Sequence, residues 1–319
     1  MPPQHLREQD FRDQFTTQDA IKACRQAFEG YGAGDIANPP RVETLKNEGG
    51  TSHFRLDMPA LWPGHFRCRK VIEETADAGP GHLGTRHAWI DLEDLSDGTC
   101  IRLDAGHITD LRTGAAGALS LEYLAGAQLQ RIAIVGTGRI AHHLALACDS
   151  LFDLRELRCT SRDAGNRANF AAALVPQLRC SKLNMTPSIE SCLEGVDAVL
   201  TAVPTAQPIL SSSLLRSIDT VIAIAGDGRT RQLQAEILET RRVIVDVPQQ
   251  AEKSGEFLYA ASTGNSDKIR LARMPDDTVL TLGDAACGRL PGSGGVAYMT
   301  GMAAQDLCAA AMIYRRFRS

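Results

Sequence analysis

Apolar and polar positions alternate in two different ways along the chain, and the N-terminal part predicts a mixed region of helix and sheet. Between residues 18 and 35, apolar side chains from Ile21 to Phe28 recur at helical spacing before glycine-rich breakers, which predicts an amphipathic helix. Residues 41–104 instead contain short β-like runs separated by the turn sequences WPG, AGPG and SDG, a pattern typical of an antiparallel meander. A helical pattern returns over residues 108–125.

From residue 131 onward, buried-strand runs alternate with helical segments. The predicted strands cover residues 131–136, 156–160, 197–204, 219–226 and 241–248, and the predicted helices cover residues 139–150, 163–174 and 230–238. Because strands interleaved with helices form parallel sheets, this half predicts an α/β fold with a doubly wound, Rossmann-type parallel sheet. Residues 298–317 consist largely of small and apolar residues and predict one long closing helix that packs back on the first domain.

Composition narrows the class of protein. The 319 residues carry a formal net charge of −4, with 44% hydrophobic and 23% charged residues, which is ordinary for a globular protein and offers no basic surface for nucleic acid or membrane. No apolar stretch reaches the roughly 18 residues of a spanning helix. The polar start MPPQHLREQDFRDQF does not resemble a signal peptide, so we expect a cytoplasmic protein.

Cysteine and histidine usage argues against metal and disulfide chemistry. The nine cysteines are scattered without any C-x-x-C pair, which favours small buried hydrophobes in a reducing compartment over a disulfide framework or a zinc ribbon. His142 and His143 are adjacent inside a predicted helix and therefore lie on different faces. We predict ordinary surface or packing roles for both, and no metal site.

A glycine-rich turn marks a nucleotide site. Gly136, Thr137, Gly138, Arg139 and Ile140 begin a G-x-G-x-x-A sequence that directly follows an apolar strand and opens a helix. In that context the first glycine allows a tight turn, the second lets the backbone approach a pyrophosphate, and the helix amino terminus faces the phosphates. The sequence therefore predicts dinucleotide binding.

The end of the second strand of this region bears on the choice between NAD and NADP. An acidic residue there would bind the ribose 2′-hydroxyl, whereas arginine accommodates a 2′-phosphate. Here Ser161 and Arg162 precede Asp163, which favours NADP(H) slightly and leaves NAD(H) open. In the alternative interpretation, Arg162 only caps a surface turn, and Asp163 or Ser161 caps the following helix.

Two further residues have both a catalytic and a structural interpretation. In DAGHITDLRTGAAG (residues 104–117), Arg112 is either a carboxylate-binding residue or a first-turn charge on the unfavourable end of a helix dipole. The small residues after it would leave room for a cofactor. Asp227 stands between two glycines after a parallel strand, where it can be a catalytic acid or base or simply a turn residue.

Seven segments, taken together and in order, resemble the ornithine cyclodeaminase/μ-crystallin family. They are Pro40-Arg41, DMPALWPGHFRCRK ending in Lys70, LRTGAAGALSLEYLA with Arg112, IVGTGRIA, DAVLTAVPT, IAGDG and MTGMAAQDLCAAAMIY. The resemblance extends from about residue 18 to the C-terminus. This family includes cyclodeaminases, alanine dehydrogenase, ketimine and iminosuccinate reductases, opine-type synthases and a hormone-binding crystallin.

The resemblance implies a set of site residues and an organisation into two domains. Substrate contacts would come from Arg41, Lys70, Arg112 and Gly301, and the catalytic groups would be Lys70, Arg112 and Asp227, with Asp227 handling the amine proton. The resemblance also implies cofactor contacts at Thr85, Ala202, Val203, Gly226 and Thr300. These add to Arg112, to the glycine-rich turn and to the Ser161-Arg162 loop. A substrate-binding and homodimerising α+β domain would comprise residues 1–125 with 290–319, and the dinucleotide domain would comprise residues 126–289.

Three functions remain open at this stage. The first is an NAD(P)(H)-dependent dehydrogenase that reduces an α-imino acid, made from a 2-oxo acid and an amine, to an L-amino acid. The second is a cyclodeaminase lyase using bound NAD, and the third is a non-catalytic, crystallin-like binding protein.

Met299 replaces a residue that is commonly charged in the family, which leaves the substrate in doubt. One of the cations of the first domain could bind a second carboxylate, as in iminosuccinate; these are His53, Arg55, His65, Arg67, Arg69, Lys70, His82, Arg86 and His87.

Overall fold

The computed structural model describes residues 4–48, 51–77, 85–226 and 228–318, and the chain divides into two compact units. Unit 1 comprises Met1–Arg112 and Met302–Ser319, and unit 2 comprises Thr113–Gly301. The sequence placed these divisions at residues 125 and 290. The differences arise at one helix and one strand that are described below.

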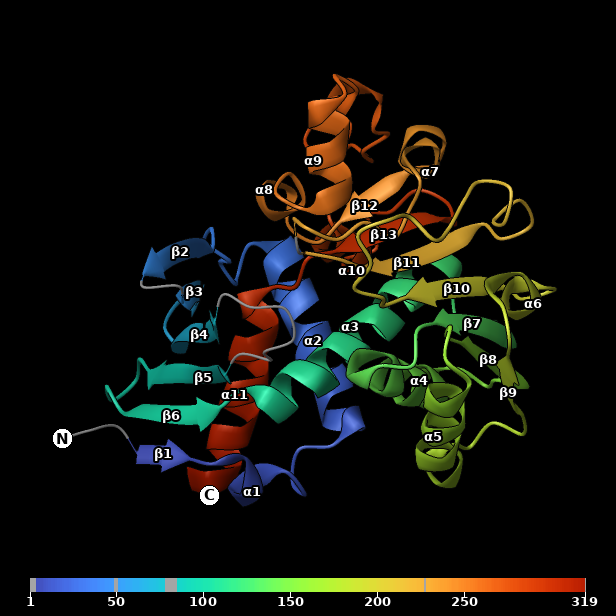
Figure 1. Ribbon diagram of the computed structural model, residues 1–319. Helices are drawn as coiled ribbons and strands as arrows, with labels where there is room; N and C mark the ends of the chain where they lie inside the picture. The colour runs from blue at the N-terminus through green and yellow to red at the C-terminus, as the bar shows by residue number, and fades with distance from the viewer. Residues whose placement is uncertain (1–3, 49–50, 78–84, 227, 319) are drawn as a thin grey trace. The chain divides into compact units, whose positions relative to one another are not determined.

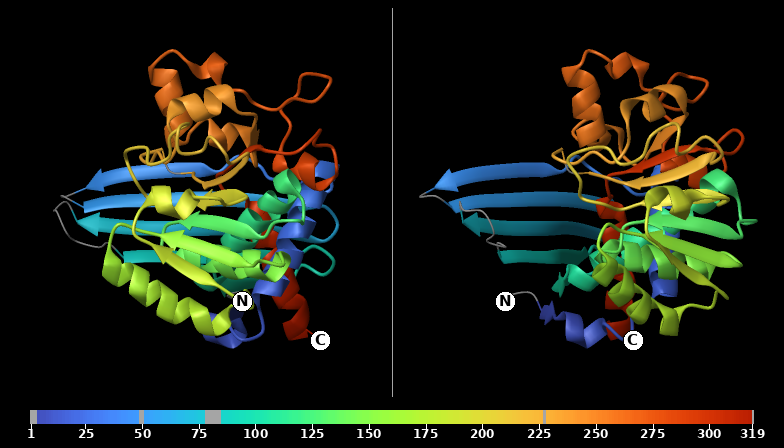
Figure 2. Two further views of the ribbon diagram at one scale, coloured as in Figure 1. Left: turned by 90° about the vertical axis from the view of Figure 1, so that its right-hand side faces the viewer. Right: turned by 45° about the vertical axis from the view of Figure 1, so that its right-hand side comes forward.

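Unit 1 contains a six-stranded sheet covered by helices (Figure 1). Its strand order is β1-β6-β5-β4-β3-β2, with bounds Gln4–Leu6, Cys100–Asp104, Thr85–Asp94, Phe66–Asp77, Thr51–Trp62 and Val42–Glu48. Strands β2 to β6 pair antiparallel in chain order, which confirms the predicted meander, and β2 to β5 run side by side in Figure 2. The helices are α1 (Glu8–Phe11), α2 (Thr17–Ala33) and α11 (Ala303–Arg318).

Helix α11 packs against α2 and against strands β3, β4 and β5 of this sheet. Side chains alternate between the two faces of a strand, so neighbouring residues of β4 have opposite environments. Arg67 and Arg69 are exposed, whereas Cys68 and Lys70 are buried. The strand register sets Lys70 between Met58 of β3 and Ile90 of β5, and both of these are buried as well.

Unit 2 contains a seven-stranded parallel sheet, as expected for a Rossmann-type fold. The strand order is β12-β13-β11-β10-β7-β8-β9, with bounds Val243–Val245, Gly295–Met299, Thr220–Ile224, Ala198–Thr201, Arg131–Val135, Glu156–Thr160 and Leu183–Thr186. The helices are α4 (Arg139–Leu151), α5 (Ala164–Leu174), α6 (Ile189–Leu193), α7 (Ala235–Thr240), α8 (Pro248–Ala251), α9 (Gly255–Ser262) and α10 (Leu282–Ala286). Short 3-10 turns cover Val175–Gln177 and Ser266–Lys268.

Several segments of unit 2 differ from the sequence prediction. Strand β13 lies between β11 and β12, so Gly295–Met299 are part of this sheet and the closing helix begins only at Ala303. Strand β9 and helices α6, α8, α9 and α10 were not predicted, and the helix expected over residues 230–238 instead covers Ala235–Thr240. Short apolar runs fit a buried strand and a buried helix equally well, which explains why hydrophobic periodicity missed β13.

Helix α3 (Gly106–Ala125) contains the division between the units and corrects two expectations. It begins before residue 108, so Arg112 lies in its second turn, where the helix dipole has little effect on a side-chain charge. The glycines after Arg112 serve packing rather than leaving room for a cofactor. A Cβ on Gly114 would lie 2.4 Å from the backbone carbonyl carbon of His143, and one on Gly117 would lie 2.3 Å from Leu144 Cδ2. These glycines therefore allow α4 to approach α3 closely.

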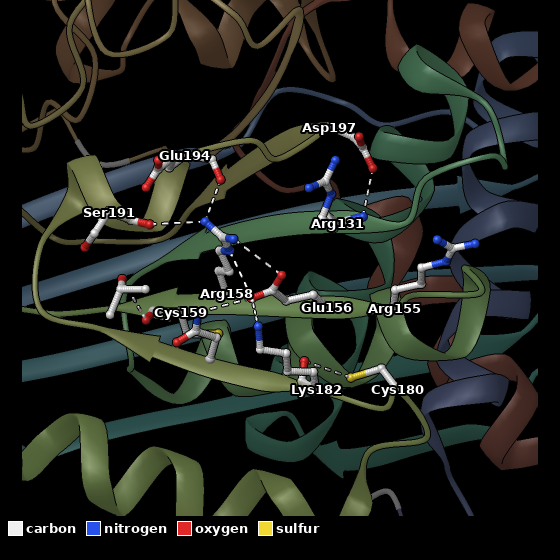
Figure 3. Close-up of polar contacts among 12 residues, drawn as sticks. Arg131, Arg155, Glu156, Arg158, Cys159, Cys180, Lys182, Ser191, Glu194 and Asp197 are labelled. Carbon is white, nitrogen blue, oxygen red and sulfur yellow. Dashed lines mark hydrogen bonds and ion pairs between the residues drawn. The ribbon is translucent and has the colours of Figure 1, made fainter.

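A charged network joins β8, β9 and α6 at the amino ends of the strands (Figure 3). The Glu156 carboxylate accepts hydrogen bonds from Arg158 and Asn184 and pairs with Lys182, each at 3.0–3.1 Å. Burial opposes the ionisation of Glu156, but hydrogen bonds from these three residues outweigh it and lower the pKa of Glu156 to about 2. Arg158 also donates to the carbonyl oxygen of Glu194. This network therefore lies near the amino ends of the strands, whereas the glycine-rich turn follows the carboxyl end of β7.

Candidate functional site

A cavity of about 330 Å³ opens at the carboxyl ends of the unit 2 strands. Its lining includes seven of the predicted cofactor residues, namely Gly136, Thr137, Gly138, Ser161, Arg162, Ala202 and Val203. The structure thus brings together residues from the ends of β7, β8 and β10, which are far apart in the sequence. Arg139 and Ile140 form the first turn of α4 and do not line this cavity. The carboxyl edge of a parallel sheet is where such folds bind nucleotides.

The turn after β7 fits a pyrophosphate. Gly136 has φ +121°, which disfavours other residues, and a Cβ there would lie 3.0 Å from the Ala202 carbonyl oxygen. At Gly138 a Cβ would meet no atom within 4 Å, so open space faces this backbone. Gly138 is also the N-cap of α4 and offers no side-chain cap to the first amides of that helix. Those amides can therefore donate to an anion.

The loop after β8 shows how Asp163 is used. Its carboxylate accepts a hydrogen bond from the Asn166 backbone amide at 2.6 Å, which makes it the N-cap of α5. Arg167 donates to the backbone carbonyl oxygens of Ser161 and Arg162 and so braces the loop. Arg162 itself is exposed and lines the cavity. The one carboxylate in this part of the lining is thus engaged by the helix that follows it.

Buried polar groups hold the neighbouring strand ends in place. Asp246, which directly follows β12, accepts hydrogen bonds from four donors: the amides of Val247, Thr300 and Gly301 and the hydroxyl of Thr300. Burial raises the pKa of Asp246, and these four hydrogen bonds oppose that shift. The predicted residues Thr300 and Gly301 are therefore fixed by a carboxylate that sequence reasoning missed. Gly226 lies against Thr300, since a Cβ on Gly226 would be 2.8 Å from the Thr300 carbonyl oxygen.

A second buried network centres on Gln232. Its side-chain oxygen accepts from the Thr201 hydroxyl and the Val203 amide, and its side-chain nitrogen donates to the Ile224 carbonyl oxygen at 2.6 Å. The Glu256 carboxylate in turn accepts hydrogen bonds from the Gln232 backbone amide and from the Tyr298 hydroxyl. Burial, reinforced by Glu256, raises the pKa of Tyr298 well above its usual range. These groups tie together the ends of β10, β11 and β13. Sequence reasoning missed Gln232 and Glu256 as well.

In unit 1 the predicted residues Lys70 and Arg112 lie in one buried cluster around Asp306. Lys70 Nζ is 2.8 Å from Asp306 Oδ1 and 2.7 Å from Thr109 Oγ1, and neither Lys70 nor Asp306 is exposed. Arg112 Nε lies 3.4 Å from the same carboxylate oxygen, and Arg112 Nη1 donates to Gln305 Oε1 at 3.1 Å. The polar pair Gln305-Asp306 in the otherwise apolar first half of the tail helix was the signal that sequence reasoning passed over.

Electrostatics makes this cluster suited to an anion. Burial lowers the pKa of Lys70 to about 8, and the nearby Arg112 cation acts in the same direction, while Asp306 opposes the shift. The cluster holds two cationic side chains and one carboxylate, so its formal charge is positive when Lys70 is protonated. A buried site with excess positive charge favours a carboxylate ligand.

The other predicted residues of unit 1 have separate environments. Arg41 is buried just before β2 and pairs with Glu43, whose Oε1 lies 2.9 Å from Arg41 Nε. Thr85 begins β5, opposite Thr75, and is exposed. Asp227 and His82 lie outside the described residues. The candidate roles of these residues stay predictions.

The four arginines among the cations proposed to bind a second carboxylate lie on the sheet and have acidic partners. Four arginines form ion pairs with carboxylates of the same sheet: Arg55 with Asp57 and Glu73, Arg67 with Glu93, Arg69 with Asp57, and Arg86 with Glu74. Strand pairing places these partners close together in space. Each of these guanidinium groups is thus already balanced by an acid.

Within the described part of the chain, no group of three or more histidine, cysteine or acidic side chains is arranged to hold a metal ion. None of the helices in those ranges is long and apolar enough to cross a bilayer.

The glycine-rich turn and helix amino terminus on a doubly wound parallel sheet define unit 2 as a Rossmann-type dinucleotide-binding domain. The chain as a whole belongs to the ornithine cyclodeaminase/mu-crystallin family, whose sequence profile matches residues 5–319.

Similar proteins cover nearly the whole chain. An alanine dehydrogenase of Archaeoglobus fulgidus is 27% identical over 318 residues, covering 97% of this chain and 93% of the relative. A Δ1-pyrroline-2-carboxylate/Δ1-piperideine-2-carboxylate reductase of Azospirillum brasilense is 25% identical and covers 89% and 86%. Among solved structures, an archaeal alanine dehydrogenase dimer with bound NAD superposes with a TM-score of 0.81 at 23% identity, covering 99% and 96%. That last likeness shows the fold.

Proposed function

We propose that this protein is an NAD(P)(H)-dependent reductase of α-imino acids, which form from a 2-oxo acid and an amine, and that its product is an L-amino acid. The observation that carries this proposal is the buried Lys70–Asp306–Arg112 cluster, whose excess positive charge suits the α-carboxylate of such a substrate. The nucleotide cavity of unit 2 supports the requirement for a dinucleotide. Relatives named as an alanine dehydrogenase and an imino-acid reductase agree with this reaction class.

The roles of the side chains follow from their charges. The Lys70 ammonium and the Arg112 guanidinium bind the carboxylate of the substrate through charge-assisted hydrogen bonds, and Arg41 adds a third cation. Holding the carboxylate fixes the imine carbon in the orientation that hydride transfer needs. When bound, the reduced nicotinamide supplies the hydride that the imine carbon accepts. Asp227, by its resemblance to the family position, exchanges the proton at nitrogen.

A substrate with one carboxylate agrees best with the environment of the cations. An acidic imino acid such as iminosuccinate would need a further cation for its second carboxylate. The four sheet arginines that were candidates for this role already pair with acids. We therefore propose monocarboxylate imino acids as the preferred class, with iminosuccinate as the acidic alternative.

The loop after β8 favours NADP(H). Arg162 lines the nucleotide cavity, where its guanidinium can pair with a 2′-phosphate, whereas the Asp163 carboxylate caps α5 instead of meeting a ribose hydroxyl.

A homodimer is proposed as well. Val42 and Leu45 on the edge strand β2 are 60% and 63% exposed, which is unusual for apolar side chains at a sheet edge unless another chain covers them. Light scattering would measure the mass in solution, and a monomer would contradict this.

Absorbance of reduced nicotinamide tests the reaction. The enzyme is mixed with NADPH or NADH and with pyruvate, oxaloacetate or glyoxylate plus ammonia or methylamine, and with Δ1-pyrroline-2-carboxylate. Net oxidation of the cofactor is expected, with pyruvate preferred over oxaloacetate. Ammonia release from ornithine without net cofactor change would instead identify a cyclodeaminase. Cofactor binding with neither reaction would support a non-catalytic binding protein.

A further inference from the structure

We propose that Asp306 is a positioning residue that holds Lys70 and Arg112 together and keeps the Lys70 ammonium charged at neutral pH, without touching the substrate itself. This proposal rests on the proposed function, in which Lys70 and Arg112 bind the substrate carboxylate. Asp306 lies on α11, Lys70 on β4 and Arg112 on α3, so three separate elements meet at one carboxylate oxygen.

The geometry leaves one donor of Lys70 for a ligand. An ammonium group has three N–H donors. Within the described residues, Lys70 has two acceptors, Asp306 Oδ1 at 2.8 Å and Thr109 Oγ1 at 2.7 Å. Thr109 donates its own hydroxyl hydrogen to the Ala105 carbonyl oxygen at 2.6 Å, so its oxygen is oriented to accept from Lys70. The third N–H has no acceptor among the described residues, and we assign it to the substrate carboxylate, with the other two fixing its direction.

Charge balance makes Asp306 necessary for that role. Among the described residues, the charged groups that act on Lys70 are Arg112 on α3, Arg86 on β5 and Asp306 on α11, and both arginines disfavour a second cation there. The nearby thiols of Cys24, Cys68 and Cys308 supply no negative charge, because burial raises the pKa of all three. Asp306 is therefore the compensating anion. Without it Lys70 would lose its proton at lower pH, and a neutral amine could not pair with the carboxylate.

The pH dependence of turnover distinguishes positioning from a purely structural role. In the wild type, kcat/KM for the imino acid should fall above pH 8 as Lys70 loses its proton. In Asp306→Asn this fall should begin at least one pH unit lower, with KM at pH 7.5 raised at least tenfold and much of the loss recovered at pH 6. An unchanged pH profile, or an equal loss of kcat at every pH with KM unaltered, would overturn the proposal.

Two further variants isolate the effect. Arginine does not titrate in this range, so Lys70→Arg should abolish the fall above pH 8, and adding Asp306→Asn to it should produce no shift. Asp149→Asn is the matched control, because Asp149 is also a buried acid but accepts from backbone amides of unit 2. It is expected to change stability without moving the pH profile. NADPH fluorescence checks that each variant folds and binds cofactor.

A direct measurement separates failure of this proposal from failure of the proposed function. Protein labelled with [ε-¹³C]lysine gives a Lys70 resonance that is assigned by its loss in Lys70→Arg. The titration midpoint of that resonance should be lower in Asp306→Asn than in the wild type. If no 2-oxo acid and amine support turnover, the proposed function fails while this titration still tests the Lys70–Asp306 link. If turnover is found but the midpoint is the same in both proteins, the link itself is wrong.

Discussion

The carboxylate of Asp246 accepts hydrogen bonds from both the backbone amide and the side-chain hydroxyl of Thr300, at 2.8 and 2.7 Å. It also accepts from the Gly301 amide at 2.7 Å, and the Asp246 side chain is fully buried. One acid at the end of β12 therefore sets the course of the chain after β13. Because Thr300 and Gly301 are candidate cofactor and substrate contacts, the shape of this turn matters for function as well as for stability.

Asp246→Asn should weaken both the stability of the fold and the binding of cofactor. The amide group of asparagine would face two of the four donors with its own N–H groups, and each buried donor left without an acceptor costs about 1–3 kcal/mol. We expect the free energy of unfolding to fall by about 2–4 kcal/mol and the KM for cofactor to rise. Urea unfolding measures the first effect and initial rates the second. Asp153→Asn, at an exposed acid of the same unit, is the control and should unfold like the wild type. The same urea midpoint for both variants would contradict this account.

Alanine at two glycines of the nucleotide turn should affect different properties, stability at Gly136 and cofactor binding at Gly138. At Gly136 the positive φ and the approach of the Ala202 carbonyl oxygen leave no place for a Cβ, so Gly136→Ala should lower the free energy of unfolding by about 1–3 kcal/mol. At Gly138 a Cβ would enter open space, so Gly138→Ala should leave stability unchanged within about 0.5 kcal/mol. It should nevertheless weaken NADPH binding at least tenfold, because the methyl group would occupy the approach of the pyrophosphate. Fluorescence titration and thermal melting separate the two effects. Normal cofactor affinity in Gly138→Ala would show that the phosphates bind elsewhere.

Arg162 should decide between the two dinucleotides. Loss of its guanidinium removes the charge that would pair with a 2′-phosphate, so Arg162→Ala should raise the KM for NADPH about tenfold, the effect of roughly 1.4 kcal/mol. The KM for NADH should change less than twofold. Arg155→Ala is a matched control, since Arg155 is an exposed arginine at the opposite end of the same strand (Figure 3). Equal effects of Arg162→Ala on both cofactors would place Arg162 outside the 2′-phosphate site.

The sequence predicted those features of the fold that depend on local pattern. Side chains alternate along a strand, so residue order alone places Lys70 on the opposite face from Arg67 and Arg69, and the structure shows Lys70 buried and both arginines exposed. The spacing of the glycine-rich turn placed Gly136 and Gly138 at the end of a buried strand, and the structure brings them to one cavity with Ser161 and Arg162. These features are readable because strand period and turn chemistry are properties of neighbouring residues.

The residues that sequence reasoning missed act across long separations. Asp306 meets Lys70 across 236 positions, and Asp246 meets Thr300 across 54. A single acid in an apolar segment indicates that it has a buried partner but does not identify that partner, because the pairing depends on the tertiary packing of two elements. The glycines after Arg112 show the converse. Their small size was correctly noticed, but their contact with α4 rather than a ligand depends on how two helices pack.

The burial of Lys70 predicts a measurable dependence of stability on pH. The pKa of Lys70 is about 8 in the folded protein and 10.5 ordinarily, so between these values the unfolded chain binds a proton that the folded chain lacks. Stability from this group therefore rises with pH across that window and is constant below it. Lys70→Met keeps a long unbranched side chain that cannot titrate. The difference in unfolding free energy, wild type minus Lys70→Met, should increase by about 1–2 kcal/mol between pH 8 and pH 9.5.

Urea unfolding of both proteins at several pH values measures this difference. Groups that titrate in both proteins, such as the buried cysteines, cancel in the subtraction. Lys22→Met provides the control, because Lys22 is an exposed lysine on α2. The difference in unfolding free energy between the wild type and Lys22→Met should not change with pH. A flat or falling difference for Lys70→Met would mean that the folded protein keeps Lys70 protonated as readily as water does. The two-acceptor arrangement around its ammonium would then outweigh the cost of burial, and the fall of activity above pH 8 would have to come from another group.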